Sequence, residues 1–258
     1  REGYVNSVVE VSIENLENDA VAVTFDVNVG DEIIIKKVNY NGAENLDVDD
    51  FKEVTANNEE DFVSWWFGQN GGEVNLEQLE FDAPRIRDQY FKNGYLDSIV
   101  KDPFLKVNFA SNDAVLDFFI SEGMQYKTND IKIYVDATIM DPEPLYEELK
   151  LSKDDIFNIE KLRKDQKFLK TKISDLGYAF AQVLYDIKKD EKNGTADIVF
   201  NIIPGKKVYI NDVIISGNGR TLDRVIRRDV YLAHGDLFNL TDFEDSRKKL
   251  KRTSFFKD

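Results

Sequence analysis

The sequence contains no cysteine and only one histidine, His234, among its 258 residues. Without cysteine, disulfides, thiolate catalysis and zinc ribbons are excluded, and a single histidine argues against a His-based metal centre or a Ser-His-Asp triad. No apolar run approaches the ~20 residues that a membrane-spanning helix needs. We therefore expect no metal, no cofactor and no catalytic centre, and the sequence predicts a protein that is not an enzyme.

Basic side chains are scarce as well: 34 lysines and arginines stand against 49 aspartates and glutamates, giving a net charge of −15. This excess argues against nucleic-acid binding, which needs a basic surface. With 42% hydrophobic residues the chain is too apolar to be disordered. It opens at Arg1-Glu2-Gly3-Tyr4 without an initiator Met, so we expect a stretch from the middle of a longer protein.

The sequence repeats itself. Three stretches begin with Gly-Tyr and end 26 to 28 residues later at another glycine, and they run from Tyr4 to Gly30, Tyr95 to Gly123 and Tyr178 to Gly205. Residues seven, five and three positions before the closing glycine are always apolar, which is the period of a strand with one inward face. These columns are Val23, Phe25 and Val27; Leu116, Phe118 and Ile120; and Ile198, Phe200 and Ile202.

A second pair of apolar columns follows the closing glycine by eight and ten residues and predicts another strand. Its members are Val38 and Tyr40, Ile131 and Ile133, and Val213 and Ile215. A turn glycine comes next in two copies, at Gly42 and Gly217. The middle copy has Asp136-Ala137 in place of Gly-Asn, so we expect its turn to differ in shape.

Two helical stretches lie between that strand and the next Gly-Tyr. The longer one begins after Asn75, with Gln78 in a capping-box pattern, after Asn158 in the second copy, and at Thr241 with Glu244 in the third. Short helices are expected near Leu46–Val54, Pro142–Leu149 and Leu222–Val230. Each unit thus reads strand, helix, helix, strand, strand, and the predicted class is α+β, with a three-stranded mixed sheet covered by two helices.

These columns divide the chain into four parts. Residues 1–30 are the closing hairpin of an incomplete module, 31–123 and 124–204 are complete modules, and 205–258 is the N-terminal part of a further one. The first complete module carries about 11 extra residues, which fall between Asn57 and Gly72. This insertion holds both tryptophans, Trp65 and Trp66, which we expect to serve in core or inter-module packing rather than as a binding platform.

The pattern resembles the POTRA domain, the periplasmic repeat of the BamA family, which assembles β-barrels into bacterial outer membranes. The resemblance rests on Lys92-Asn93-Gly94-Tyr95, on the joint Ile120-Ser121-Glu122-Gly123-Met124-Gln125-Tyr126, and on Ile214-Ile215-Ser216-Gly217-Asn218. The Trp65-Trp66 pair is similar to the third of five such domains, and Val225 to Val230 is similar to the opening helix of the fifth. The resemblance implies a periplasmic array, part of an outer-membrane protein, that adjoins a membrane-embedded barrel.

The resemblance also implies partners: unfolded outer-membrane barrel precursors and accessory assembly lipoproteins. If the first strand of a module pairs with its last, the strand after Gly-Tyr lies at the sheet edge, where its free backbone can accept an added client strand. The candidate edge is Asp97, Ser98, Ile99, Val100 and Lys101, ending near Pro103. An ordinary edge strand protected by charge remains the alternative.

Charge is unevenly distributed. Residues 1–30 carry −5, residues 31–123 carry −12, residues 124–204 carry −2 and residues 205–258 carry +4. In the basic last part, Arg224, Arg227, Arg228 and Asp229 are the candidate docking site for a lipoprotein, because arginine forms bidentate contacts with carboxylates. A solvated helix face and proximity to an anionic membrane surface are the alternatives.

Two other functions remain open. The chain could be the POTRA arm of a related secretion or translocation barrel, which would have the same fold. It could also be an extracytoplasmic enzyme or ligand-binding protein, which a pocket lined by acids with perturbed pKa values would indicate.

Overall fold

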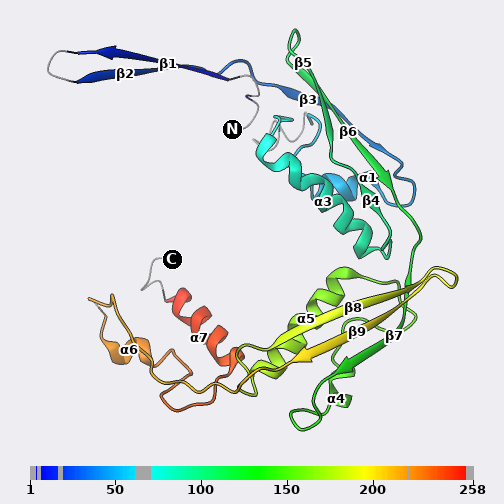
Figure 1. Ribbon diagram of the computed structural model, residues 1–258, viewed down its shortest axis with the longest axis vertical. Helices are drawn as coiled ribbons and strands as arrows, with labels where there is room; N and C mark the ends of the chain where they lie inside the picture. The colour runs from blue at the N-terminus through cyan, green and yellow to red at the C-terminus, as the bar shows by residue number, and fades with distance from the viewer. Residues whose placement is uncertain (1–3, 5–6, 17–19, 62–70, 220, 254–258) are drawn as a thin grey trace. The chain divides into compact units, whose positions relative to one another are not determined.

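The computed structural model describes residues 4, 7–16, 20–61, 71–219 and 221–253 (Figure 1). The chain forms two compact units, residues 1–125 and 126–258. Trp65 and Trp66 lie outside the described residues. No helix among the described residues has the length and apolarity needed to cross a membrane.

The first unit opens with an antiparallel hairpin of β1 (Val8–Asn15) and β2 (Val21–Asn28). Apolar residues of both strands share one face of this hairpin, since Val11 is opposite Phe25 and Ile13 is opposite Val23. This face is open: the Phe25 side chain is 64% exposed. The expectation that this first copy of the apolar columns is inward-facing is therefore wrong, because no described helix covers it.

Each of the next two parts of the chain forms the expected sheet of mixed strand direction. In the first, β6 is central, with β3 parallel on one side and β4 and β5 antiparallel on the other. In the second, β9 is central between parallel β7 and antiparallel β8. The predicted α+β class is confirmed.

The elements of the first sheet and its helices are β3 (Ile34–Asn41), α1 (Val48–Lys52), α3 (Leu76–Lys92), β4 (Ile99–Val100), β5 (Phe104–Asn108) and β6 (Asp113–Ser121), called module β3–β6 below. Those of the second are β7 (Lys127–Tyr134), α4 (Glu143–Tyr146), α5 (Ile159–Ser174), β8 (Gln182–Asp190) and β9 (Thr195–Ile203), called module β7–β9.

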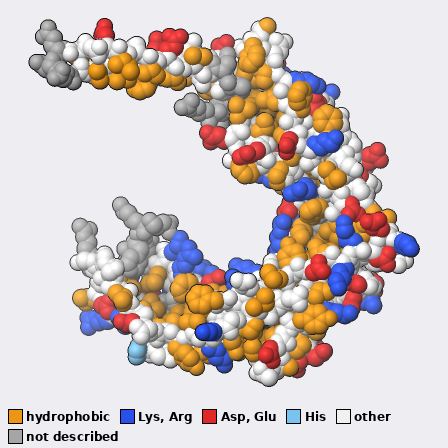
Figure 2. Space-filling view, viewed as in Figure 1, with side chains coloured by type: hydrophobic (Ala, Val, Ile, Leu, Met, Phe, Trp, Pro, Cys, Tyr) orange, Lys and Arg blue, Asp and Glu red, His pale blue; other side chains and the backbone are white. Residues whose placement is uncertain are grey.

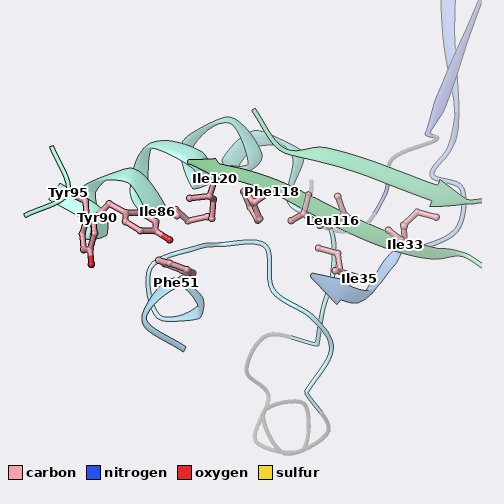
Figure 3. Packing of buried hydrophobic residues seen from close by; sticks show 11 residues of the cluster. Ile33, Ile35, Phe51, Ile86, Tyr90, Tyr95, Leu116, Phe118 and Ile120 are labelled. Carbon is pink, nitrogen blue, oxygen red and sulfur yellow. The ribbon is translucent and has the colours of Figure 1, made fainter. Parts of the chain in front are cut away.

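The apolar columns of these two modules form their cores. Leu116 and Phe118 of β6 are fully buried against α3 and α1, where Ile86, Tyr90 and Phe51 lie (Figure 3). In module β7–β9 the same columns, Ile198, Phe200 and Ile202, are at most 7% exposed. Burying each such side chain stabilises the fold by about 1.5–3 kcal/mol. The inward face predicted for these two copies is confirmed.

Asparagine caps all three long helices. Asn75 and Asn158 accept hydrogen bonds from the third residue of α3 and α5, as expected. The third long helix is α7 (Leu240–Arg252), and its cap is Asn239, which accepts from Asp242 N–H. The expected start at Thr241 is wrong, because the hydroxyl and N–H of Thr241 instead bind the carboxylate of Asp175 at the end of α5.

A buried polar residue recurs seven positions after each of these caps. Asp82 of α3 accepts hydrogen bonds from the N–H groups of Ala56 and Asn57, which follow the short helix. Asp165 of α5 accepts likewise from Lys150 and Leu151. The third copy uses the hydroxyl of Ser246, which accepts from Tyr231 N–H. Each residue ties its long helix to the preceding loop, because buried N–H groups need a partner. This column was not predicted from the sequence.

The turn of the middle copy departs from the glycine pattern as expected. Gly42 and Gly217 have positive φ angles of 93° and 78°. In module β7–β9 the side chain of Asp136 instead accepts hydrogen bonds from Thr138 N–H and Oγ1, an Asx turn that needs no glycine.

The described elements of residues 205–253 are α6 (Asp223–Arg227) and α7, and no strand is assigned there. The strand expected around Val213 and Ile215 is therefore wrong for this structure. A strand exists only by hydrogen bonding to another, and no described strand is paired with these residues.

Candidate functional site

The two edges of each sheet differ. The outer backbone of β3 is already hydrogen-bonded by the chain before α3: Ile35 N–H donates to Gly72 O at 2.7 Å, and Ile35 O accepts from Glu60 N–H at 2.9 Å. In module β7–β9 Thr128 does the same with Asp154 and Asp155, at 2.7 and 2.8 Å. The first residues of each parallel strand are thus closed on their outer side by loops of the same module. Further along, Val38 N–H and Ile133 N–H donate to the side chains of Glu59 and Tyr146.

The antiparallel strand is open. Within the described residues, no backbone hydrogen bond reaches the outer side of β4, β5 or β8. The strand that follows Gly-Tyr therefore lies at the sheet edge, as the expected pairing of first and last strands requires. Such an edge offers alternate N–H and C=O groups to another extended chain.

The candidate edge at residues 97–101 is only partly a strand. Ile99 and Val100 form β4, while Asp97 and Ser98 belong to the turn before it. The Ser98 side chain is buried, and the Ile99 side chain is 61% exposed. Lys101 N–H donates to Phe119 O at 3.0 Å, so the backbone of Val100 points outward.

A β-bulge then interrupts this edge. Lys101 is opposite Phe119 and Phe104 is opposite Asp117, so Asp102 and Pro103 share the single residue Phe118 as their partner. Pro103 does not end the edge, as the sequence suggested, because β5 resumes at Phe104. An added strand would have to follow this break, and Pro103 offers it no N–H.

Strand β8 provides a longer edge without a bulge, and one of its carbonyls, that of Val183, already accepts a hydrogen bond from the Gln166 side chain. Its nine residues pair with β9 in one continuous register, from Gln182 opposite Ile203 to Asp190 opposite Thr195. The side chains of Leu184 and Tyr185 on this strand are 52% and 38% exposed. This edge was not predicted from the sequence, although the absence of proline from these nine residues indicates it.

A shallow groove of about 380 Å³ lies beside the start of β8. It is lined by Ala181 to Leu184 and by Gln166, Lys167 and Lys170 of α5. The side chain of Gln166 donates to Val183 O at 2.6 Å and holds the strand to the helix. An extended chain added to β8 would find room here for side chains, near two lysines.

The basic residues proposed for docking are divided between free and engaged side chains. Arg224 has no ion pair among the described residues, and Arg228 is exposed. Arg227 binds Asp223 at 3.2 Å and donates to Val213 O. The structure thus leaves Arg224 and Arg228 available on the surface of α6 and its C-terminal cap.

Asp229 is occupied inside this part of the chain. It is 4% exposed, and its carboxylate lies 3.2 Å from the Lys249 ammonium of α7 and 3.6 Å from Arg228 Nε. Hydrogen bonds to the Tyr231 hydroxyl and to Asp229 raise the pKa of Lys249, so its ammonium stays charged. Asp229 therefore positions α7 against α6 and is not exposed to a partner.

No group of three or more metal-ligating side chains occurs among the described residues. His234 lies in a loop and binds the carbonyl of Asn211. The carboxyl of Asp165 has a raised pKa because it is buried, but it accepts two backbone hydrogen bonds and does not line the groove beside β8. The chemistry of the site is thus that of exposed backbone and of charged surface.

The POTRA family, described as "Surface antigen variable number repeat", has a sequence model that matches residues 33–123, 126–205 and 208–258. The chain belongs to the POTRA family. Its fold is similar to the crystal structure of POTRA3-5 of Haemophilus influenzae BamA, with a TM-score of 0.71 over 87% of both chains at 21% identity. The expected resemblance to POTRA domains of BamA is confirmed.

The POTRA chain is also similar in sequence to curated proteins named outer membrane protein assembly factor BamA. It is 31% identical to that of Nitratidesulfovibrio vulgaris over 99% of this chain, and 27% identical to that of Neorickettsia risticii over 98%. It spans 32% and 34% of these relatives, about a third of their length.

Proposed function

We propose that this POTRA chain is part of the periplasmic arm of an outer-membrane assembly protein and holds unfolded barrel precursors by strand addition. The observation that carries the proposal is the difference between the two edges of each sheet: loops of the same module bind the first residues of the parallel strand, whereas among the described residues no backbone hydrogen bond is made to the outer side of the antiparallel strand. Main-chain pairing demands little of the client sequence, which suits a receptor for many different precursors.

The two open edges differ in the binding that they can support. Each backbone hydrogen bond contributes about 0.5–1.5 kcal/mol net. Ile99 and Val100 offer only one outward-facing residue before the bulge, whereas the nine residues of β8 offer outward groups at every second position. We therefore extend the client-binding proposal from residues 97–101 to β8, which we expect to bind more tightly.

A peptide corresponding to one strand of an outer-membrane barrel tests this proposal by its effect on backbone amide resonances. We expect shifts at residues 97–102 and larger ones at 182–190. The matched control is the same peptide N-methylated at alternate residues, in the two possible phases. One phase should abolish the shifts and the other should preserve them, because only one set of N–H groups faces the edge. Equal effects of both phases, or shifts confined to helix faces, would reject strand addition.

We further propose that accessory lipoproteins dock on the basic helix α6 through Arg224, Arg227 and Arg228. Asp229 contributes indirectly, because its ion pair with Lys249 positions α7 against α6. Arg227→Glu should abolish recovery of assembly lipoproteins, but it also breaks the contact of Arg227 with Asp223. Arg224→Glu reverses the same charge without breaking an ion pair, whereas Arg228→Glu also loses the contact with Asp229. Lys248→Glu on α7, which loses an ion pair with Asp245, is the control for Arg227→Glu. Unchanged recovery with all three arginine variants, measured by co-purification and mass spectrometry, would remove the assignment.

A further inference from the structure

The groove beside the start of β8 brings a strand edge and positive charge together within one complete module. It lies between β8 and α5, which pack against each other (Figure 1). Lys167 and Lys170 of α5 line it, both are exposed, and neither has an ion pair among the described residues. No acidic side chain is among the described residues that line it. The groove thus carries two positive charges that its own lining does not neutralise.

The backbone of β8 points outward at every second residue, and two contacts fix which ones. Gln166 of α5 donates to Val183 O at 2.6 Å, so this carbonyl points away from β9. On the other side of the sheet Lys127 N–H donates to Gly194 O, so Gly194 and every second residue after it face β7. The residues of β9 between them bond to β8, which gives the same result. The outward residues of β8 are therefore Val183, Tyr185, Ile187 and Lys189.

A residue level with one of these outward positions directs its side chain to the helix-covered face of the sheet. Val183 is 5% exposed and is opposite the buried Ile202, and opposite residues of neighbouring strands share a face. A client residue level with Val183 therefore has its side chain on the face where α5 carries Lys167 and Lys170. This holds for either direction of the added strand, because opposite residues share a face in both.

Module β3–β6 does not repeat this arrangement. Counted from the capping asparagines, the α3 residues in the positions of Gln166, Lys167 and Lys170 are Ala83, Pro84 and Arg87. Alanine has no side-chain donor, and only one of the two positive charges is kept. A preference for charge that depends on this groove thus belongs to β8 and not to the repeat in general.

We propose that the edge of β8 prefers client strands that carry an acidic side chain, aspartate or glutamate, level with Val183. The inference rests on the proposed function, since it specifies which strands this edge selects. The carboxylate pairs with Lys167 and Lys170, and a backbone N–H of the client replaces the Gln166 amide at Val183 O. Gln166 satisfies this carbonyl when no client is bound, because a backbone carbonyl shielded from water needs a partner.

The surface of the chain as a whole favours the opposite charge. The net charge is −15, residues 124–204 carry −2, and Figure 2 shows acidic side chains over both complete modules. Long-range attraction alone would therefore favour a basic peptide. A preference for acidic over basic strands distinguishes the local groove from the general field of the protein.

The probe is a nine-residue peptide of alternating serine and valine, acetylated and amidated at its ends. The third residue from one end is glutamate, glutamine or lysine, and each peptide is made in two forms, one for each end. Either strand direction can then bring this residue level with Val183, and the capped ends exclude a terminal carboxylate as the source of charge. For at least one form we expect the glutamate peptide to bind about fivefold more tightly than the glutamine peptide, and the lysine peptide most weakly, by amide shifts at residues 182–190.

Two double variants locate the effect. Lys167→Gln with Lys170→Gln should bind the glutamate and glutamine peptides equally, with its affinity for the glutamine peptide unchanged. Lys153→Gln with Lys192→Gln is the matched control, because both lysines are exposed in loops of the same module and have no ion pair among the described residues. This control should keep the full preference for glutamate.

Equal binding of the glutamate and glutamine peptides to the unmodified chain overturns the inference and leaves strand addition standing. A preference for the lysine peptide, or a glutamate preference that survives loss of Lys167 and Lys170, overturns it as well. Absence of shifts at residues 182–190 with all three peptides would reject strand addition at β8 together with this inference.

Gln166→Ala tests the exchange at Val183 O. The variant should bind the glutamine peptide about fivefold more tightly, because the client N–H no longer displaces an existing hydrogen bond. Circular dichroism establishes that the variant is folded. Unchanged or weaker binding of the glutamine peptide would contradict the replacement of the Gln166 amide by the client.

Discussion

Glu122 is a buried carboxylate at the end of β6, and its replacement tests how module β3–β6 is held together. One of its oxygens accepts hydrogen bonds from Glu44 N–H at 2.8 Å, Asn45 N–H at 3.0 Å and the Tyr90 hydroxyl at 2.8 Å. The other oxygen accepts from the Asn45 side chain. Glu122 thus joins the loop after β3 and the helix α3 to the central strand, a role that the sequence analysis did not assign to it.

The magnitude follows from these contacts. A hydrogen bond to a charged group contributes about 1.5–3 kcal/mol and a neutral one about 0.5–1.5 kcal/mol. Glu122→Gln removes the charge from three of these four bonds and loses the fourth, because the new NH2 group cannot accept from the Asn45 side chain. It keeps the shape of the side chain, and it also removes the cost of burying a charge. We expect it to lower the free energy of unfolding of the module by about 2–3 kcal/mol. Glu80→Gln, on the exposed surface of α3, is the matched control and should change it by less than about 0.5 kcal/mol.

The effect should depend on pH in a defined direction. Burial alone would raise the pKa of Glu122, but the hydrogen bonds from Asn45, Glu44 and Tyr90 outweigh it, and the pKa lies below its ordinary value. A lowered pKa stabilises the folded state above the pKa of the unfolded chain, about 4.3, and this contribution is lost as pH falls through the folded pKa. The difference in stability between the unmodified chain and the Glu122→Gln variant should therefore be full at pH 7 and shrink below about pH 4.3.

Urea unfolding at several pH values measures this difference. Both tryptophans of the chain, Trp65 and Trp66, belong by sequence to residues 31–123, so their fluorescence reports on this module. A destabilisation below about 0.5 kcal/mol at pH 7, or one that is the same at pH 3 and pH 7, would refute the argument.

Two further changes test the turns and the helix caps, each with a matched partner. Gly42→Ala should lower the free energy of unfolding by more than about 2 kcal/mol, because φ at Gly42 is 93° and the new Cβ would lie 2.2 Å from Ile120 O. Gly217→Ala should lower it by only about 1 kcal/mol, the cost of a positive φ, because no heavy atom lies within 4 Å of the new Cβ. Equal losses in urea titrations would contradict this. Asn239→Ala should lower the free energy of unfolding by about 1 kcal/mol, and Thr241→Ala should lower it by less. A larger loss for Thr241→Ala would mean that Thr241 is the cap of α7.

Much of the fold could be predicted from local patterns. The alternation around Phe118 and Phe200 identifies inward faces because strand side chains alternate between faces. The caps at Asn75 and Asn158 were predictable because an asparagine side chain satisfies free N–H groups at the first turn. The third cap was misplaced because Asn239 and Thr241 are both good caps, and only the position of Asp175 distinguishes them.

The candidate binding surfaces were less predictable. The sequence placed the strand after Gly-Tyr at an edge, and this depends only on which strand is central. That the first residues of the other edge are bound by Gly72 and Asp155 depends on loops that return from distant parts of the chain. Asp229 has the charge of a docking residue in the sequence, but the structure pairs it with Lys249.

The sequence by itself determined the order of strands and helices, the inward columns and the repeat, because these are set by side chains a few residues apart. Only the tertiary structure decided which backbone groups and which charges remain free. A hydrogen bond or ion pair is used up by whichever group the folded chain brings to it, and the partner is often tens of residues away. The open edge at β8 and the engaged Asp229 are the two outcomes of that competition.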